Sequence, residues 1–214
     1  MIPECNCFEE AAKKMPVIDI ILNALVFAVT ILLLVSFARK GRDYTPGRLR
    51  IAFRFFTCQS NVLCAVVCFL AALFGINGPL PEWVWLLKYI GTVGVTVTML
   101  TVFLFLAPSV GKGWMKRLLG TPHDFIMHLV SPVAALVSLL VFERRSMTFF
   151  QAMTGMLPVI LYGILYIRKT QFGPKENRWE DFYGFNRSGK LWLSVICMLF
   201  GTFLICLLLM ALQR

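Results

Sequence analysis

The chain has 214 residues, of which 58% are hydrophobic and only 15% are charged. A soluble domain is about 45–50% apolar and about 25% charged, so the composition excludes an ordinary water-soluble domain. The net charge of +10 does not indicate a nucleic-acid partner, because the basic residues gather in loops between apolar runs of membrane-spanning length.

The apolar runs predict an all-α integral membrane bundle of six transmembrane helices. Each run approaches the roughly twenty residues that cross the hydrocarbon core, and Gly and Pro residues separate several of them. We expect a polar tail over residues 1–16 and one transmembrane domain over 17–214. The expected helices are at about 17–37, 51–74, 83–106, 122–142, 147–167 and 191–212.

Two of these helices have start signals in the sequence. Thr45-Pro46 and Thr121-Pro122 predict an N-cap followed by a first-turn proline, so the second helix is expected to begin before its apolar run does. Three aromatic residues near the start of the third helix are predicted to anchor it at the membrane interface: Trp83, Trp85 and Tyr89.

Lys and Arg are distributed unevenly between the two sides that these helices define. The loops after the first, third and fifth helices hold fourteen of the 21 basic residues, and the opposite side holds five. Cytoplasmic loops of membrane proteins carry an excess of Lys and Arg. We therefore expect the basic loops in the cytoplasm, both termini outside, and the chain in a plasma membrane.

Polar residues at the start of the second apolar run recur at helical spacing. At about 100° per residue, Arg54, Thr57, Asn61, Cys64 and Cys68 share one helical face. Polar groups in hydrocarbon are costly unless they face protein or water, so this face is expected to point into the bundle.

His128, on the fourth helix, is expected at a depth similar to that of Thr57. Both helices should enter from the same side of the membrane. His128 follows Pro122 by about 9 Å of helical rise, and Thr57 follows Arg50 by about 10 Å. Asp124 precedes His128 by one turn on the same helical face.

Thr57 and His128 together carry the groups that ester hydrolysis needs. A Thr hydroxyl becomes a nucleophile when a base removes its proton, and His titrates near neutrality. Thr57 is the predicted nucleophile and His128 the base, with Ser60, Asn61 or Asp124 as supporting hydrogen-bonding residues. A structural interpretation stays open, because membrane Thr residues bond their own i−4 carbonyl and a single His often bonds a neighbouring helix.

No metal or cofactor site is predicted. The two histidines are five residues apart, unlike the i, i+4 pair of a helical zinc site, and no phosphate-binding loop is present. Cys64 and Cys68 are expected to pack as small apolar side chains, with thiol redox chemistry as an alternative. Cys5 and Cys7 in the tail are open to oxidation or metal binding.

Several short motifs occur in a distinctive order along the chain. They are Phe55-Phe56-Thr57-x-Gln59-Ser60-Asn61, Thr96-x-Thr98 with Leu106-Ala107-Pro108, His128-x-x-x-Pro132, Leu157-Pro158-x-x-x-Tyr162 and Trp179-Glu180-Asp181-Phe182-Tyr183. Over residues 50–210 this series resembles the bacterial branch of the androgen-induced membrane protein family, which has six helices in the same order.

The animal members of that family hydrolyse fatty acid esters of hydroxy fatty acids and use an intramembrane Thr and His. The resemblance implies a lipid ester hydrolase in a bacterial membrane, with Thr57 and His128 as catalytic residues. Its partners would be the bilayer and a membrane lipid or fatty-acid ester with an acidic group near the basic loops. Tyr162 is expected to line the pocket.

A non-catalytic protein is the alternative: a small transporter, or a lipid-binding or assembly subunit. An enzyme predicts Thr57 Oγ1 within about 3 Å of a His128 nitrogen, or one water away. A transporter predicts broken helices at the midplane and a path to both sides, for which Pro158 is the only suggestive mid-span proline.

Overall fold

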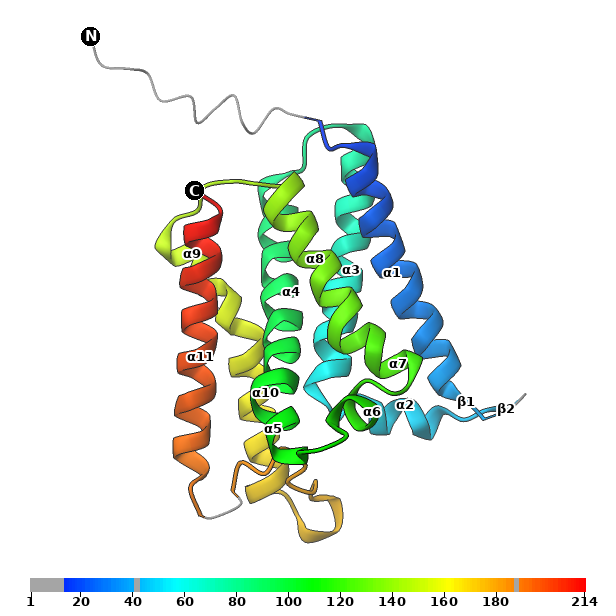
Figure 1. The fold of residues 1–214 in the computed structure, drawn as a ribbon, viewed down its shortest axis with the longest axis vertical. Helices are drawn as coiled ribbons and strands as arrows, with labels where there is room; N and C mark the ends of the chain where they lie inside the picture. The colour runs from blue at the N-terminus through cyan, green and yellow to red at the C-terminus, as the bar shows by residue number, and fades with distance from the viewer. Residues whose placement is uncertain (1–13, 41–42, 187–188) are drawn as a thin grey trace.

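The fold is described by a computed structural model for residues 14–40, 43–186 and 189–214. Within these residues, six helical spans are long and apolar enough to cross a membrane (Figure 1). This confirms the predicted all-α bundle of six apolar helices and identifies a multi-pass membrane protein. β structure in the described part is a two-residue antiparallel ladder of β1 (Arg39–Lys40) and β2 (Asp43–Tyr44).

Some spans are single helices and others join several helical segments. The first three are α1 (Val17–Ala38), α3 (Phe56–Asn77) and Glu82–Val110, which contains α4 (Glu82–Thr101), a π-helical turn (Val102–Leu106) and α5 (Ala107–Val110). The fourth, Pro122–Phe142, contains α7 (Pro122–Phe125), a π-helical turn (Ile126–Val130), α8 (Ser131–Val137) and a π-helical turn (Ser138–Phe142). The fifth, Phe149–Phe172, contains α9 (Phe149–Met153), a 3-10 turn (Thr154–Met156), α10 (Leu157–Ile167) and a π-helical turn (Arg168–Phe172). The sixth is α11 (Leu191–Leu212), and the loops contain α2 (Pro46–Ala52), α6 (Trp114–Leu118) and a 3-10 turn (Lys175–Asn177).

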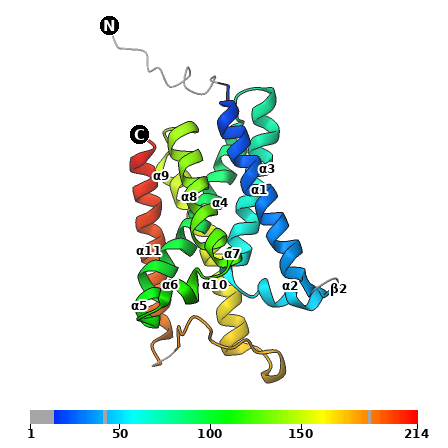
Figure 2. The same ribbon diagram turned by 45° about the vertical axis from the view of Figure 1, so that its right-hand side comes forward.

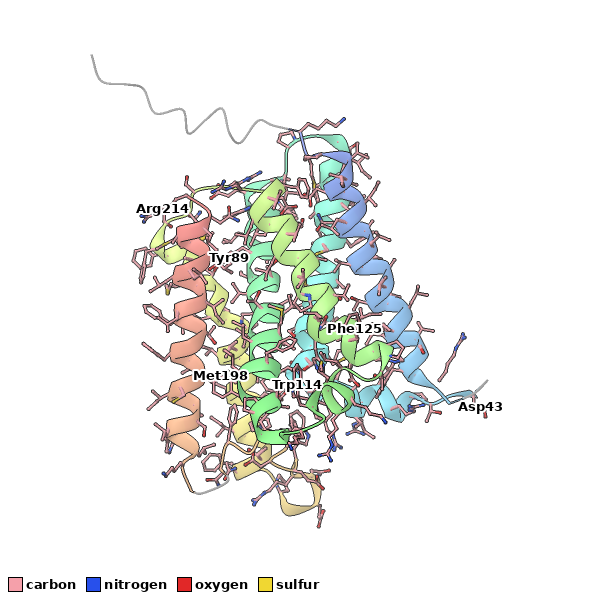
Figure 3. The ribbon with its side chains drawn as sticks, in the orientation of Figure 1. Asp43, Tyr89, Trp114, Phe125, Met198 and Arg214 are labelled. Atoms are coloured by element: carbon pink, nitrogen blue, oxygen red, sulfur yellow. The ribbon has the colours of Figure 1, made fainter. Side chains whose placement is uncertain are left out.

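The spans alternate in direction, so the three basic loops lie at one end of the bundle. Figure 3 shows Asp43 and Trp114 at that end and Arg214 at the other. α4 runs through the middle of the bundle, and α1 lies beside α3 in both ribbon views (Figures 1 and 2). The burial of side chains agrees with this arrangement. The outer helix α11 exposes Trp192, Ile196 and Phe200, whereas the central helix α4 buries Thr92. Such apolar outer faces suit contact with lipid.

Two π-helical turns each end two residues before a proline. They are Val102–Leu106 before Pro108 and Ile126–Val130 before Pro132. Proline has no amide hydrogen for the carbonyl four residues earlier and its ring crowds that carbonyl, which favours a local change in the helical hydrogen bonds. The second of these turns carries His128, and π-helical turns are frequent at functional sites.

The start of the fourth span follows the predicted cap. The Thr121 hydroxyl accepts a hydrogen bond from the Asp124 backbone N–H at 3.1 Å and donates to the Asp124 carboxylate at 2.7 Å. Thr45 stands at the corresponding position before Pro46, where α2 begins, but its side chain makes no capping bond.

The prediction of one continuous second helix over 51–74 was wrong. α2 lies across the end of the bundle (Figure 2) and is followed by a break, where Phe55 is extended (φ −92°, ψ 137°) before α3 begins. Arg54 lies in this break with an exposed side chain. It therefore does not belong to the α3 face that Thr57 and Asn61 share.

Side chains from α3, from α10 and from the loop before α11 bond the backbone of the break. The Tyr162 hydroxyl donates to the Arg54 carbonyl at 2.8 Å, and the Phe56 N–H donates to the Tyr183 hydroxyl at 3.0 Å. The Gln59 amide donates to the Phe53 carbonyl at 2.7 Å. Irregular backbone is tolerated at membrane depth only where its polar groups find such partners.

The predicted interfacial role is wrong for two of the three aromatic residues in α4. Trp85 and Tyr89 are 1% and 0% exposed, and only Trp83 faces outward. Trp85 Nε1 donates to the Glu143 carbonyl at 2.8 Å, and the Tyr89 hydroxyl donates to the Ala152 carbonyl at 2.9 Å. Each polar tip thus has a partner inside the bundle, which allows the ring to be buried.

The contact between α3 and α4 depends on Gly91. A Cβ atom there would lie 2.8 Å from Val67 Cγ2 and 3.1 Å from Cys64 Cα. We expect Gly91→Ala to lower the free energy of unfolding by about 1–3 kcal/mol, measured by thermal or denaturant unfolding in detergent. Gly201→Ala, whose Cβ meets nothing within 4 Å, is the control, and an equal loss in both variants would contradict the close approach.

Candidate functional site

A cavity of about 380 Å³ lies in the half of the bundle nearest the basic loops. Its walls come from all six spans, from α2 and the break after it, from α6 and from the loop before α11. Most of these side chains are apolar, including Met198, which lines the cavity from α11 and is labelled in Figure 3. A volume of this size falls within the range of small-molecule sites.

Thr57 and His128 both line this cavity. Two residues that were predicted at similar depth in the membrane thus share one space. Within the described residues, however, no hydrogen bond joins the Thr57 hydroxyl to the His128 ring, so the predicted direct contact of about 3 Å is not formed. Catalytic hydrogen bonds are often long without substrate and tighten when it binds.

The His128 ring is oriented by the loop before its helix. Its Nδ1 lies 3.1 Å from the carbonyl oxygen of Leu118, the last residue of α6. Because a carbonyl can only accept, Nδ1 carries the hydrogen, and in the neutral ring Nε2 holds the free lone pair. This is the protonation pattern that a general base requires.

Asn61 connects the Thr57 segment to the His128 segment. Its Nδ2 donates to the Thr57 carbonyl at 2.9 Å and to the Met127 carbonyl at 3.1 Å. Asn61 is buried outside the cavity lining, and its Oδ1 has no donor among the described residues. It supports the relative position of the two helices and does not touch the cavity.

The other supporting residues have different surroundings from one another. Ser60 faces α4, where its hydroxyl lies 2.8 Å from the Thr98 hydroxyl, and it is outside the cavity lining. Asp124 lines the cavity, but its carboxylate accepts from Thr121, and no hydrogen bond to His128 is found in the described part of the chain. Tyr162 lines the cavity as expected.

Tyr183 is a site residue that reasoning from the sequence missed. It lines the cavity and its hydroxyl accepts the Phe56 N–H, next to Thr57. Burial raises the pKa of Tyr183, against the hydrogen bond from the Phe56 N–H, which acts in the opposite direction. The phenol is therefore neutral at physiological pH, and its proton can be donated within the cavity.

Asp181 holds the loop that carries Tyr183. Its Oδ1 accepts from the Tyr166 hydroxyl at 2.6 Å and from the Phe185 N–H at 2.9 Å, and its Oδ2 accepts from the Asn186 N–H at 2.7 Å. The aromatic segment before the last helix was visible in the sequence, but a loop has no periodicity from which its packing over Thr57 could be deduced.

The structure offers no metal centre or disulfide among the residues it describes. No group of three His, Cys, Asp or Glu residues there could hold a metal ion. Cys64 and Cys68 lie one turn apart on α3 with their sulfur atoms 3.9 Å apart, buried and unbonded, as expected for packing. Cys5 and Cys7 lie outside the described residues.

Comparison with known proteins adds no relative to these observations. No protein-family model, no curated protein and no solved structure matches the chain.

Proposed function

We propose that the protein hydrolyses a lipid ester, such as a fatty acid ester of a hydroxy fatty acid, inside the membrane. The observation that carries this proposal is that Thr57 and His128, from different spans, line one largely apolar cavity. The cavity would hold acyl chains, and an apolar ester in the bilayer could reach it from the side. The family resemblance of the motifs around both residues supports the same reaction.

In the proposed reaction His128 Nε2 removes the proton from the Thr57 hydroxyl. Thr57 Oγ1 then attacks the ester carbonyl carbon, and the tetrahedral intermediate collapses when the His128 imidazolium protonates the leaving alcohol. Water, activated by the same imidazole, releases the acyl group from Thr57. The bond from Nδ1 to Leu118 keeps the ring in the tautomer that these steps need.

Tyr183 is the proposed donor to the oxyanion. Its hydroxyl oxygen accepts the Phe56 N–H, and no acceptor for its own proton is found among the described residues. That proton could therefore be donated to a carbonyl oxygen beside Thr57. We expect Tyr183→Phe to lower kcat by about 10²-fold, as loss of one oxyanion donor does, with a small change in KM. Kinetics of the folded variant would test this, and an unchanged kcat would exclude Tyr183 from the reaction.

A fluorophosphonate probe tests the proposed function directly. Purified protein in detergent should be labelled, and labelling should be lost in Thr57→Ala and in His128→Ala variants that remain folded. Mass spectrometry of the labelled protein should place the adduct on Thr57. An adduct elsewhere would show that another residue is the nucleophile, and no labelling of folded wild type would argue against an activated threonine.

Binding without turnover is the second candidate function. It is favoured by the largely apolar cavity walls and by the missing hydrogen bond between Thr57 and His128. In that case the cavity would retain a lipid during purification, and Thr57→Ala would leave the amount of bound lipid unchanged. Native mass spectrometry of the wild type and the variant separates this outcome from hydrolysis.

We further propose that the basic end of the bundle faces the cytoplasm of a plasma membrane. Exposed Ser109 lies at that end and exposed Ser146 at the other. In a background with Cys5→Ser and Cys7→Ser, intact cells treated with a membrane-impermeant maleimide should label Ser146→Cys and spare Ser109→Cys. The reverse pattern would invert the orientation.

A further inference from the structure

A second polar cluster lies at the end of the bundle opposite the cavity. Asp19 and Asn23 come from α1, Lys88 from α4, and Ser138 and Glu143 from the end of the fourth span. All five residues are more than nine-tenths buried. We call these five residues the acid–lysine cluster; none of them lines the cavity.

Hydrogen bonds connect the members of the cluster into one network. Lys88 Nζ donates to Glu143 Oε1 and to the Ser138 hydroxyl, which in turn donates to Asp19 Oδ1. Asn23 Nδ2 lies 3.3 Å from Asp19 Oδ1 and 3.4 Å from Glu143 Oε1. The Asp19 and Glu143 carboxyl groups are therefore brought together at one amide nitrogen.

The network leaves both charge and hydrogen bonding incomplete. With both carboxyls ionised, the cluster would hold two negative charges and one positive charge away from water. Three of its buried oxygens, Asp19 Oδ2, Asn23 Oδ1 and Glu143 Oε2, have no donor within the described residues. A buried acceptor without a donor is costly, and an uncompensated buried charge costs more.

A further cation near the cluster, Arg145, forms no ion pair with it among the described residues. The Arg145 guanidinium stands 5.9 Å from the Trp85 ring centre and donates to the Leu80 carbonyl, and Lys88–Glu143 is the single ion pair of the described residues. Arg145 acts over a longer distance on the carboxylates of Glu143 and Glu82. Its side chain is half-buried and lies outside the buried network. From α3, the buried Cys64 packs beside Gly91, one turn along α4 from Lys88.

We propose that Asp19 and Glu143 share one exchangeable proton, so that the acid–lysine cluster is a proton-binding site. Two adjacent carboxylates do not both ionise readily, and the shared proton leaves one negative charge to pair with the Lys88 ammonium. Protonation of Asp19 Oδ2 or Glu143 Oε2 gives one of these unpaired oxygens a hydrogen that it can donate. The proton thereby holds α1 against α4 and the end of the fourth span.

Infrared spectroscopy of the full-length protein in nanodiscs tests this site. At pH 7 the wild type should show the carbonyl-stretch band of a protonated carboxylic acid, because exposed carboxyls are ionised there. The band should disappear in Asp19→Asn or in Glu143→Gln and persist in Glu176→Gln, a control at an exposed glutamate. No acid band in folded wild type, or a band that survives both cluster substitutions, would overturn the proposal.

Thermal unfolding supplies a second readout. The folded protein holds a proton that the unfolded chain releases at neutral pH, so stability should fall as pH rises. Asp19→Asn, which mimics the neutral acid, should flatten this dependence. If sodium, compared with choline, instead raises the wild-type midpoint in a saturable way that Asp19→Asn abolishes, the site binds an alkali cation and the proton assignment is wrong.

Discussion

Thr57→Val should abolish ester hydrolysis while leaving the protein folded. Valine keeps the shape of threonine and removes only the hydroxyl, which is the proposed nucleophile. Loss of the general base alone costs about 10²–10⁴-fold, and loss of the nucleophile should cost at least as much. The measurement is kcat/KM for a fatty acid ester of a hydroxy fatty acid with protein in mixed micelles. Thr57→Ser, which keeps a hydroxyl, should retain measurable turnover.

His128→Asn is the matched test of the base. The asparagine amide can occupy the position of Nδ1 and keep the bond to the Leu118 carbonyl, but it has no counterpart of Nε2. We expect a loss of about 10²–10⁴-fold in kcat with the unfolding midpoint nearly unchanged. Wild-type turnover in both Thr57→Val and His128→Asn would contradict the proposed mechanism and favour the binding function.

The architecture was the most predictable part of the molecule. Six apolar runs of membrane-spanning length directly reflect the thickness of the hydrocarbon core. The depth of Thr57 and His128 was also accessible, because helical rise per residue is nearly constant and both helices enter from the basic end. The two residues, from distant parts of the chain, both line one cavity.

The break between α2 and α3 could not be predicted from periodicity. Residues 51–56 are apolar or aromatic apart from Arg54, and they read as the start of a helix. The break is stable because Tyr162 and Tyr183 bond its backbone, and both partners are more than a hundred residues away in sequence. Tyr183 was missed as a candidate site residue for the same reason, because its contact with Phe56 spans 127 residues of sequence.

The burial of Trp85 was hidden for a related reason. An aromatic residue near a helix end is usually expected at the membrane interface. It can be buried instead when its polar atom finds a hydrogen-bond acceptor inside the bundle. Here the Glu143 carbonyl accepts from Trp85, and the Glu143 side chain belongs to the acid–lysine cluster. Packing at this end of the bundle thus depends on charged residues such as Lys88 and Glu143. In the sequence, Lys88 lies within an apolar run and Glu143 directly after one, and nothing there shows that the two meet.

The two ends of the bundle consequently have different physical characters. The basic end contains the cavity, a helix break and a loop folded over Thr57, all of which suit the admission of a substrate. The opposite end is dense and polar inside, with buried groups from α1, α4 and the fourth span bonded together. The acid–lysine cluster thus bonds together three spans that also line the cavity: α1, α4 and the fourth span.

Lys88→Met should be the most destabilising single substitution outside the cavity. Removing the ammonium leaves a buried Glu143 carboxylate without its ion partner, and breaking a buried pair in this way costs about 3–5 kcal/mol. Thermal unfolding in detergent should show a midpoint lower by roughly 6–20 °C, given about 2–4 °C per kcal/mol for a chain of this size. Lys116→Met, at an exposed site, should leave the midpoint unchanged.

A second substitution should reverse much of that loss. In Lys88→Met/Glu143→Gln, the remaining Asp19 carboxyl can stay neutral, so no unpaired charge is buried. A double-mutant cycle should therefore give a coupling energy of at least about 1 kcal/mol, within the range found for residues in one network. Strictly additive losses would mean that Lys88 and Glu143 act independently and that charge balance does not hold this end of the bundle together. Recovery in the double variant would instead identify the ammonium as the counter-charge around which α1 and α4 pack.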